Sequence, residues 1–169
     1  ALPTQPQRLV HAEEFLAMVL EFPNAIAWLN GHSHVNTITA HPRVDGQPGG
    51  LWEITTASCI DFPQQQRVIE VVDNRDQTIS IFTTALDHAS PVEWSGDLSP
   101  TGLASLSREL SANDWVENPT MRRGTELDRN AELLLPAPFD LSAVTDAQVE
   151  QAQAADRTRL LAWESGWPA

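Results

Sequence analysis

The stretch that decides the fold is RVIEVVDNRDQTISIFTTAL, residues 67–86. It holds two runs rich in β-branched residues, at 67–72 and 78–86, and the polar segment DNRDQ separates them at 73–77. Two such runs joined by a short polar segment predict a β-hairpin, here with a five-residue loop. Just upstream, apolar and polar residues alternate from Leu51 onward, and this alternation predicts a further strand.

The sequence before this β-rich region predicts one helix and two strands. Apolar residues recur at helical spacing over residues 10–22, and Pro23 ends that pattern. The continuous apolar run AIAWL at 25–29 predicts a strand that is buried on both faces. A second strand is expected over 35–40, and the Gly- and Pro-rich segment 41–50 is expected to be a loop.

The last part of the chain predicts mainly helices. Ser99 followed by Pro100 is typical of a helix start, with serine as the N-cap and proline in the first turn. A short helix is expected around 128–135, and a last helix over 145–164. The inward faces of the first and last of these helices are expected to carry Leu103, Leu106, Leu110, Val149, Ala152, Leu160 and Trp163.

Composition excludes several classes of function. The formal net charge is −13, and all 10 basic residues are arginine. Such a negative chain repels a polyphosphate backbone, so we expect no nucleic-acid partner. The absence of lysine excludes Schiff-base and Walker-type phosphate chemistry. No apolar run approaches the about 20 residues that span a bilayer, so we expect no membrane association. The single cysteine excludes an internal disulfide.

The most informative local motif is GHSH at 31–34, directly after the apolar run. On an extended segment, His32 and His34 project to the same side, and Gly31 allows close approach of the backbone to an ion. This arrangement suits two metals about 3.5–4 Å apart, with one imidazole nitrogen for each. Zn, Fe, Mn and Ni all accept imidazole. Taken alone, His-x-His is a weak motif, and ordinary loop histidines are the alternative.

The surrounding sequence resembles a known family. NGHSHVN at 30–36 is similar to the last signature of the calcineurin-like metallophosphoesterases, a Gly-His-x-His that follows an apolar strand. The segments after it resemble the closing strands of that family's β-sandwich, especially in a bacterial subgroup from high-GC genomes, whose composition would favour arginine over lysine. The segments that resemble the closing strands are LWEITTAS (51–58), DFPQQ (61–65) and the hairpin. Two further segments, DRN (128–130) and ELL (132–134), are similar to the subgroup's tail.

The resemblance implies an α+β fold. It makes the chain the C-terminal half of a metallophosphoesterase-type β-sandwich with flanking helices and a helical C-terminal tail. Residues 1–90 would be the C-terminal portion of the core, and 91–169 a helical extension packed on it. The similarity is specific over about 10–90 and weaker beyond.

The resemblance also implies a function. The family hydrolyses phosphate mono- or diesters with two divalent ions, here Mn, Fe or Zn. His34 would bind the first metal and His32 the second. The family's other signatures, Asp-x-His, Gly-Asp-x-x-Asp and Gly-Asn-His-Asp/Glu, are absent, and Gly96-Asp97 lacks the second Asp. We therefore expect a C-terminal part of a longer enzyme that has no catalytic residue of its own, holds no metal tightly and is inactive alone.

Separation from an upstream half would expose an apolar face. Either two copies form a homodimer through this face, or the C-terminal helices fold over it. The sequence leaves the substrate-binding residues and the location, cytoplasmic or exported, undetermined. The alternative function is a self-contained β-rich binding or interaction module with an incidental His-x-His. A third hypothesis is an adventitious metal-binding domain.

Structural roles are expected for the other residues that carry chemistry. His41 and His88 are expected in loops or packing positions. Cys59 is expected to be a small buried apolar residue. Glu53 is expected to face solvent from its strand.

Overall fold

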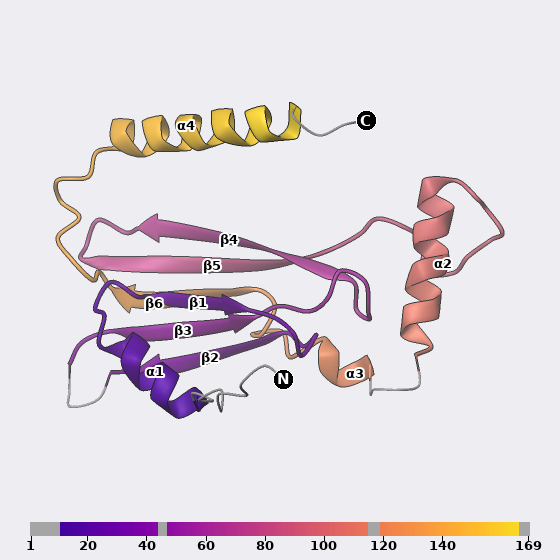
Figure 1. Ribbon diagram of the computed structural model, residues 1–169, viewed down its shortest axis with the longest axis horizontal. Helices are drawn as coiled ribbons and strands as arrows, with labels where there is room; N and C mark the ends of the chain where they lie inside the picture. The colour runs from indigo at the N-terminus through magenta and orange to yellow at the C-terminus, as the bar shows by residue number, and fades with distance from the viewer. Residues whose placement is uncertain (1–10, 44–46, 115–118, 166–169) are drawn as a thin grey trace, which may run out of the picture.

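The computed structural model describes residues 11–43, 47–114 and 119–165, and these form an α+β structure with two three-stranded sheets (Figure 1). The helices are α1 (Ala12–Leu20), α2 (Pro100–Ala112), α3 (Pro119–Arg122) and α4 (Asp146–Ser165). The strands are β1 (Ala27–Asn30), β2 (Thr37–Pro42), β3 (Gly50–Thr55), β4 (Gln65–Asp73), β5 (Thr78–Asp87) and β6 (Ala131–Pro136). In this described part, no helix combines the length and apolar character that a bilayer crossing requires.

The first sheet has the order β1-β3-β2, with β1 parallel and β2 antiparallel to β3. The expectation that the 25–29 strand is buried on both faces is wrong, because Leu29 is 57% exposed. Its strand β1 lies at the edge of the sheet, and among the described residues it pairs with β3 alone. Strand β2 also continues through His41 and Pro42, which were expected in a loop, because both residues are in register with the start of β3.

The second sheet has the order β4-β5-β6 and is antiparallel throughout. The predicted hairpin is confirmed as β4 and β5, with Val71 opposite Ile81. The helix expected over 128–135 is wrong, because residues 131–136 form strand β6. Leu133 is 5% exposed and the next residue, Leu134, is 57% exposed. This period of two is a strand pattern, and pairing with β5 selects it over the helix.

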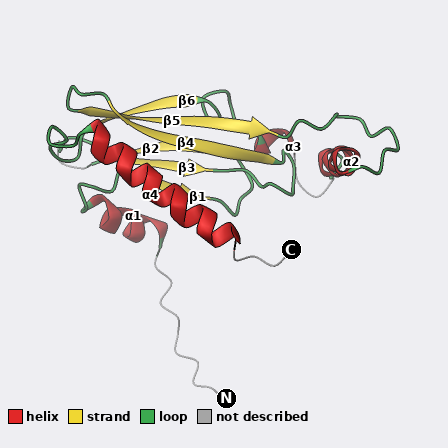
Figure 2. Ribbon diagram, turned by 90° about the horizontal axis from the view of Figure 1, so that it is seen from above, coloured by secondary structure: helices red, strands yellow, loops and turns green. Residues whose placement is uncertain are grey.

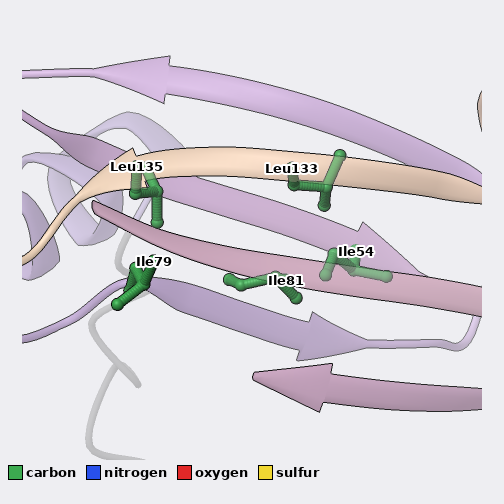
Figure 3. Packing of buried hydrophobic residues seen from close by; sticks show 5 residues of the cluster. All are labelled: Ile54, Ile79, Ile81, Leu133 and Leu135. Carbon is green, nitrogen blue, oxygen red and sulfur yellow. The ribbon is translucent and has the colours of Figure 1, made fainter. Parts of the chain in front are cut away.

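The two sheets pack face to face around one apolar cluster. Ile54 of β3 lies in the same buried cluster as residues of β5 and β6, so side chains of both sheets meet in the interior. Figure 3 shows the members of this cluster, which are Ile54, Ile79, Ile81, Leu133 and Leu135.

Helix α2 begins as the sequence predicts, since the Ser99 side chain accepts a hydrogen bond from the Gly102 amide. Its buried residues are Gly102 and Ser105, however, whereas Leu103 and Leu110 are exposed. The expected inward leucine face is therefore wrong for these two leucines. The helix lies beyond the end of the sheets (Figure 2).

Helix α4 confirms the predicted last helix, but it does not cover the sandwich. Every side chain that is described in it, over residues 146–159, is exposed. The inward positions expected for Val149 and Ala152 are wrong for this reason, and Leu160 and Trp163 lie outside the described side chains. The homodimer stays a prediction. The division of the chain at residue 90 also stays a prediction, although β6, which follows residue 90, pairs with β5, which precedes it.

Candidate functional site

The segment with the two histidines follows β1, at the end of the sandwich where α2 and α3 lie (Figure 1). His32 has φ +80° and His34 has φ +57°. Both residues are in the left-handed region, so the extended segment expected from the sequence is wrong, and so is the argument that its geometry places both rings on one side. Non-glycine residues hold such values at a cost of about 1–3 kcal/mol each, and they concentrate at functional sites.

The structure brings His34 together with an acidic residue from a distant loop. The Nδ1 of His34 lies 2.6 Å from Oδ2 of Asp61, with side-chain exposures of 38% and 41%. An ionised carboxylate only accepts hydrogen bonds, so Nδ1 carries the proton that it donates to Asp61. The Nε2 of a neutral His34 ring then keeps its lone pair available for a metal ion.

His32 is exposed, and its ring makes no hydrogen bond or ion pair with any residue that the structure describes. Each histidine therefore keeps at least one ring nitrogen without a hydrogen-bond partner among the described residues. Across 11–43, 47–114 and 119–165, no three His, Cys, Asp or Glu side chains are grouped closely enough to hold a metal ion. An ion bound here would need further protein ligands from elsewhere.

A buried amide fixes the chain directly after the two histidines. Asn36 is 1% exposed. Its Nδ2 donates to Oε1 of Gln65 at 2.7 Å. Its Oδ1 accepts the amide of Ala57 at 3.0 Å and Nη2 of Arg67 at 3.0 Å. These bonds tie the histidine segment to the ends of β3 and β4. Asn36 is part of the NGHSHVN stretch, but the sequence does not reveal this role, because it depends on contacts with residues distant in the chain.

A charged pair completes this polar cluster. Arg67 also donates to the backbone oxygens of Asp128 and Arg129, at 2.7 and 3.1 Å. Burial lowers the pKa of the Arg67 guanidinium, and the charge of Asp128 opposes this shift. Burial alone would raise the pKa of Asp128. Hydrogen bonds from Thr125 and the Ile38 amide, with the charge of Arg67, outweigh burial and hold that pKa below its usual value.

Among the other titratable residues, Glu53 and Cys59 differ from their expected roles, whereas His88 does not. In β2, His41 places Nε2 2.8 Å from Oε2 of Glu53, and Asn30 donates to Oε1 of Glu53 at 2.7 Å. Glu53 is thus paired rather than fully solvated. Cys59 is exposed, so the expected buried position is wrong. The Nε2 of His88 contacts the Gln64 side chain, in keeping with a packing role.

A pocket of about 840 Å³ lies at the opposite end of the sandwich. It opens between α1 and the residues before β1, before β3 and after β6. Its lining is mostly apolar and includes Leu16, Leu20, Ile26, Leu135 and Pro138. The lining residues do not include the histidine segment, so the pocket is separate from it. Its volume is in the range of small-molecule sites, and the pocket is therefore a second candidate for binding.

The candidate site is thus the histidine segment, with left-handed backbone at His32 and His34, an aspartate in contact with His34 and a buried polar support at Asn36. Comparison of the chain with protein-family models, with curated proteins and with solved structures finds no match.

Proposed function

We propose that this chain is the C-terminal region of a dinuclear-metal phosphoesterase of the calcineurin-like type. In this proposal His32 and His34 supply one nitrogen ligand to each of two divalent ions, Mn, Fe or Zn. The substrate is a phosphate mono- or diester. The remaining ligands come from a part of the polypeptide upstream of residue 1.

The observation that carries the proposal is the contact between His34 and Asp61. Histidines that bind metals almost always donate their second ring N–H to a carboxylate, a carbonyl or water. The 2.6 Å contact of His34 Nδ1 with Asp61 Oδ2 is of this kind and leaves Nε2 available. The left-handed backbone at both histidines also supports a functional role, because only surrounding structure can maintain such strain.

The two-sheet arrangement is compatible with the proposal. The histidine segment follows a strand that is parallel to its neighbour β3, and the two sheets pack around one apolar cluster. Strand β1 is an edge strand with an exposed Leu29, so it is open to pairing with a further strand. The upstream half of a larger sandwich would supply such a strand.

The chain's own contribution to the reaction is limited to holding and orienting. Two bound divalent ions would stabilise negative charge on the phosphoryl oxygens. His32 and His34 are neutral nitrogen ligands and bring no negative charge to balance such ions. The Asn36 cluster keeps the segment in place, and Asp61 orients His34. No residue of this chain is assigned a proton transfer.

The test compares this chain with a polypeptide that extends upstream to the natural start codon. Hydrolysis of p-nitrophenyl phosphate and bis-p-nitrophenyl phosphate is measured with added Mn²⁺. We expect no turnover from the chain alone and metal-dependent turnover from the extended polypeptide, lost in His32→Ala and His34→Ala. An extended polypeptide without Asp-x-His and Gly-Asn-His blocks, or turnover that survives both changes, would contradict the proposal.

The alternative is a self-contained β-rich binding module in which His-x-His is incidental. The pocket of about 840 Å³ favours it, because its lining is mostly apolar and lies far along the sandwich from the histidines. The alternative predicts that Leu20→Trp, which would fill the pocket, abolishes ligand binding while His34→Ala has no effect.

A further inference from the structure

We propose that Asp61 is the positioning residue of His34, which sets the tautomer of the imidazole and thereby directs Nε2 toward a metal ion. The part of this inference that concerns metal rests on the proposed function. The part that concerns the tautomer does not, because it is a property of the chain without any ion.

The first step is the contact itself. The Nδ1 of His34 and Oδ2 of Asp61 are 2.6 Å apart, which is hydrogen-bond distance, with the carboxylate oxygen as the acceptor. In a neutral imidazole only one nitrogen carries hydrogen, and the partner of that nitrogen decides which one it is. Asp61 therefore keeps hydrogen on Nδ1 and leaves Nε2 as the acceptor.

The second step is that the loop carrying the carboxylate is held in place through its backbone. The Ser58 hydroxyl oxygen accepts the amides of Ile60 and Asp61, at 3.0 and 3.1 Å. The Asp61 carbonyl accepts the amide of Gln64 at 2.8 Å. The Gln64 side chain in turn donates to the hydroxyl of Ser107 in α2 at 2.8 Å. The loop that carries Asp61 is thus anchored at both ends.

The third step is that His34 is fixed from its other side. It has left-handed backbone geometry, and two residues later the buried Asn36 anchors the chain to β4 through Gln65. Ring and carboxylate thus belong to two anchored segments, and Asn36 joins these segments through Ala57 and Gln65. The hydrogen bond to Asp61 can therefore form before any ion binds, and such a bond orients a metal-binding histidine in advance.

The tautomer is tested by ¹⁵N NMR of the imidazole nitrogens in the 169-residue chain, without metal, at about pH 8.5, above the usual titration range of histidine. We expect hydrogen on Nδ1 of His34 in the unchanged chain and in Asp61→Glu. In Asp61→Ala we expect a shift toward the Nε2–H form. His32 in the same spectra is the internal control, and Asp156→Ala on exposed α4 is the matched variant.

Backbone amide spectra report whether each variant keeps the fold, and Asp61→Val, which also has no hydrogen-bond acceptor, replaces Asp61→Ala if the alanine variant unfolds. An Nδ1–H tautomer that persists in folded Asp61→Ala or Asp61→Val would overturn the inference. So would an Nε2–H tautomer in the unchanged chain.

The metal part is tested by Zn²⁺ and Mn²⁺ titration calorimetry on the polypeptide extended to its natural start codon. We expect Asp61→Ala to weaken affinity about 10- to 100-fold and Asp61→Glu to restore most of it. His34→Ala should abolish binding of one ion. Equal affinity in Asp61→Ala and the unchanged protein would refute the positioning role alone. Equal binding in His34→Ala would refute the proposed function, while the tautomer result would stand.

Discussion

Arg67 donates from Nη2 to Oδ1 of Asn36 at 3.0 Å, and this bond joins the two sheets at the end of the sandwich that carries the histidines. Arg67 lies in β4 of the second sheet, whereas Asn36 directly precedes β2 of the first. Since Asn36 lies two residues after His34, the position of the candidate ligand depends on this bond between the sheets.

Replacement of Asn36 by alanine should destabilise the fold. It removes the partner of the Ala57 amide, Gln65 and Arg67 at once, and buried groups left without partners cost about 1–3 kcal/mol each. We expect a loss of at least about 2 kcal/mol in urea unfolding. Asn74→Ala in the exposed hairpin loop, expected to lose about 1 kcal/mol or less, is the control. Equal losses would contradict the special role of Asn36.

A change at Gly124 tests how closely its backbone approaches the backbone of Asn36. It has φ +65°, and a Cβ there would lie 2.2 Å from the carbonyl oxygen of Asn36. Gly96 has φ +88° with open space around a Cβ. Both Gly→Ala changes incur the cost of left-handed alanine, about 1–2 kcal/mol, and Gly124→Ala adds a steric clash. Thermal unfolding should therefore show a clearly larger loss for Gly124→Ala. Equal Tm shifts would argue against the packing described.

The alternation of strand β6 is tested by two neighbouring leucines. Leu133 is 5% exposed and Leu134 is 57% exposed. We expect Leu133→Ala to cost about 2–5 kcal/mol because it opens a cavity between the sheets. Leu134→Ala should cost about 0.5 kcal/mol or less. Denaturant unfolding of both variants provides the measurement, and similar costs for the two would indicate the helix that the sequence predicted.

Asp128 should contribute to acid sensitivity. Its pKa is lowered in the folded protein, so the ionised form stabilises the fold above about pH 4, and acid removes that contribution as it protonates the carboxylate. Asp128→Asn should therefore be less stable than the unchanged chain near neutral pH. The difference should shrink as pH falls below about 4. Urea unfolding at a series of pH values measures it, and a difference that stays constant with pH would exclude this role.

The sequence predicts the fold best where the signal is local. The hairpin depends on adjacent runs and their loop, and the start of α2 on Ser99 and its neighbours, and both are confirmed. Strand β6 was missed because three consecutive leucines fit a helix and a strand equally, and only pairing with β5 separates them. The burial of β1 was overestimated because periodicity does not show how many neighbours a strand has.

The candidate site shows the same division. His32 and His34 stand out in the sequence as a motif at a strand end. Asp61 is 27 positions further along the chain than His34, and although both lie in segments that resemble the same family, their spacing does not predict a contact. Only the path of the chain through β2 and β3 brings them together. Asn36 is similar, since a lone asparagine after a motif carries no signal of burial.

The most direct test of the central claim is the metal content of the polypeptide extended to its natural start codon, measured by elemental analysis after gel filtration. Two bound divalent ions are predicted for the unchanged protein, and one fewer for His32→Ala and for His34→Ala, since each histidine serves a different ion. Folding of both variants is checked by circular dichroism. Metal content that is the same in all three proteins, or no metal in the unchanged one, would contradict the account.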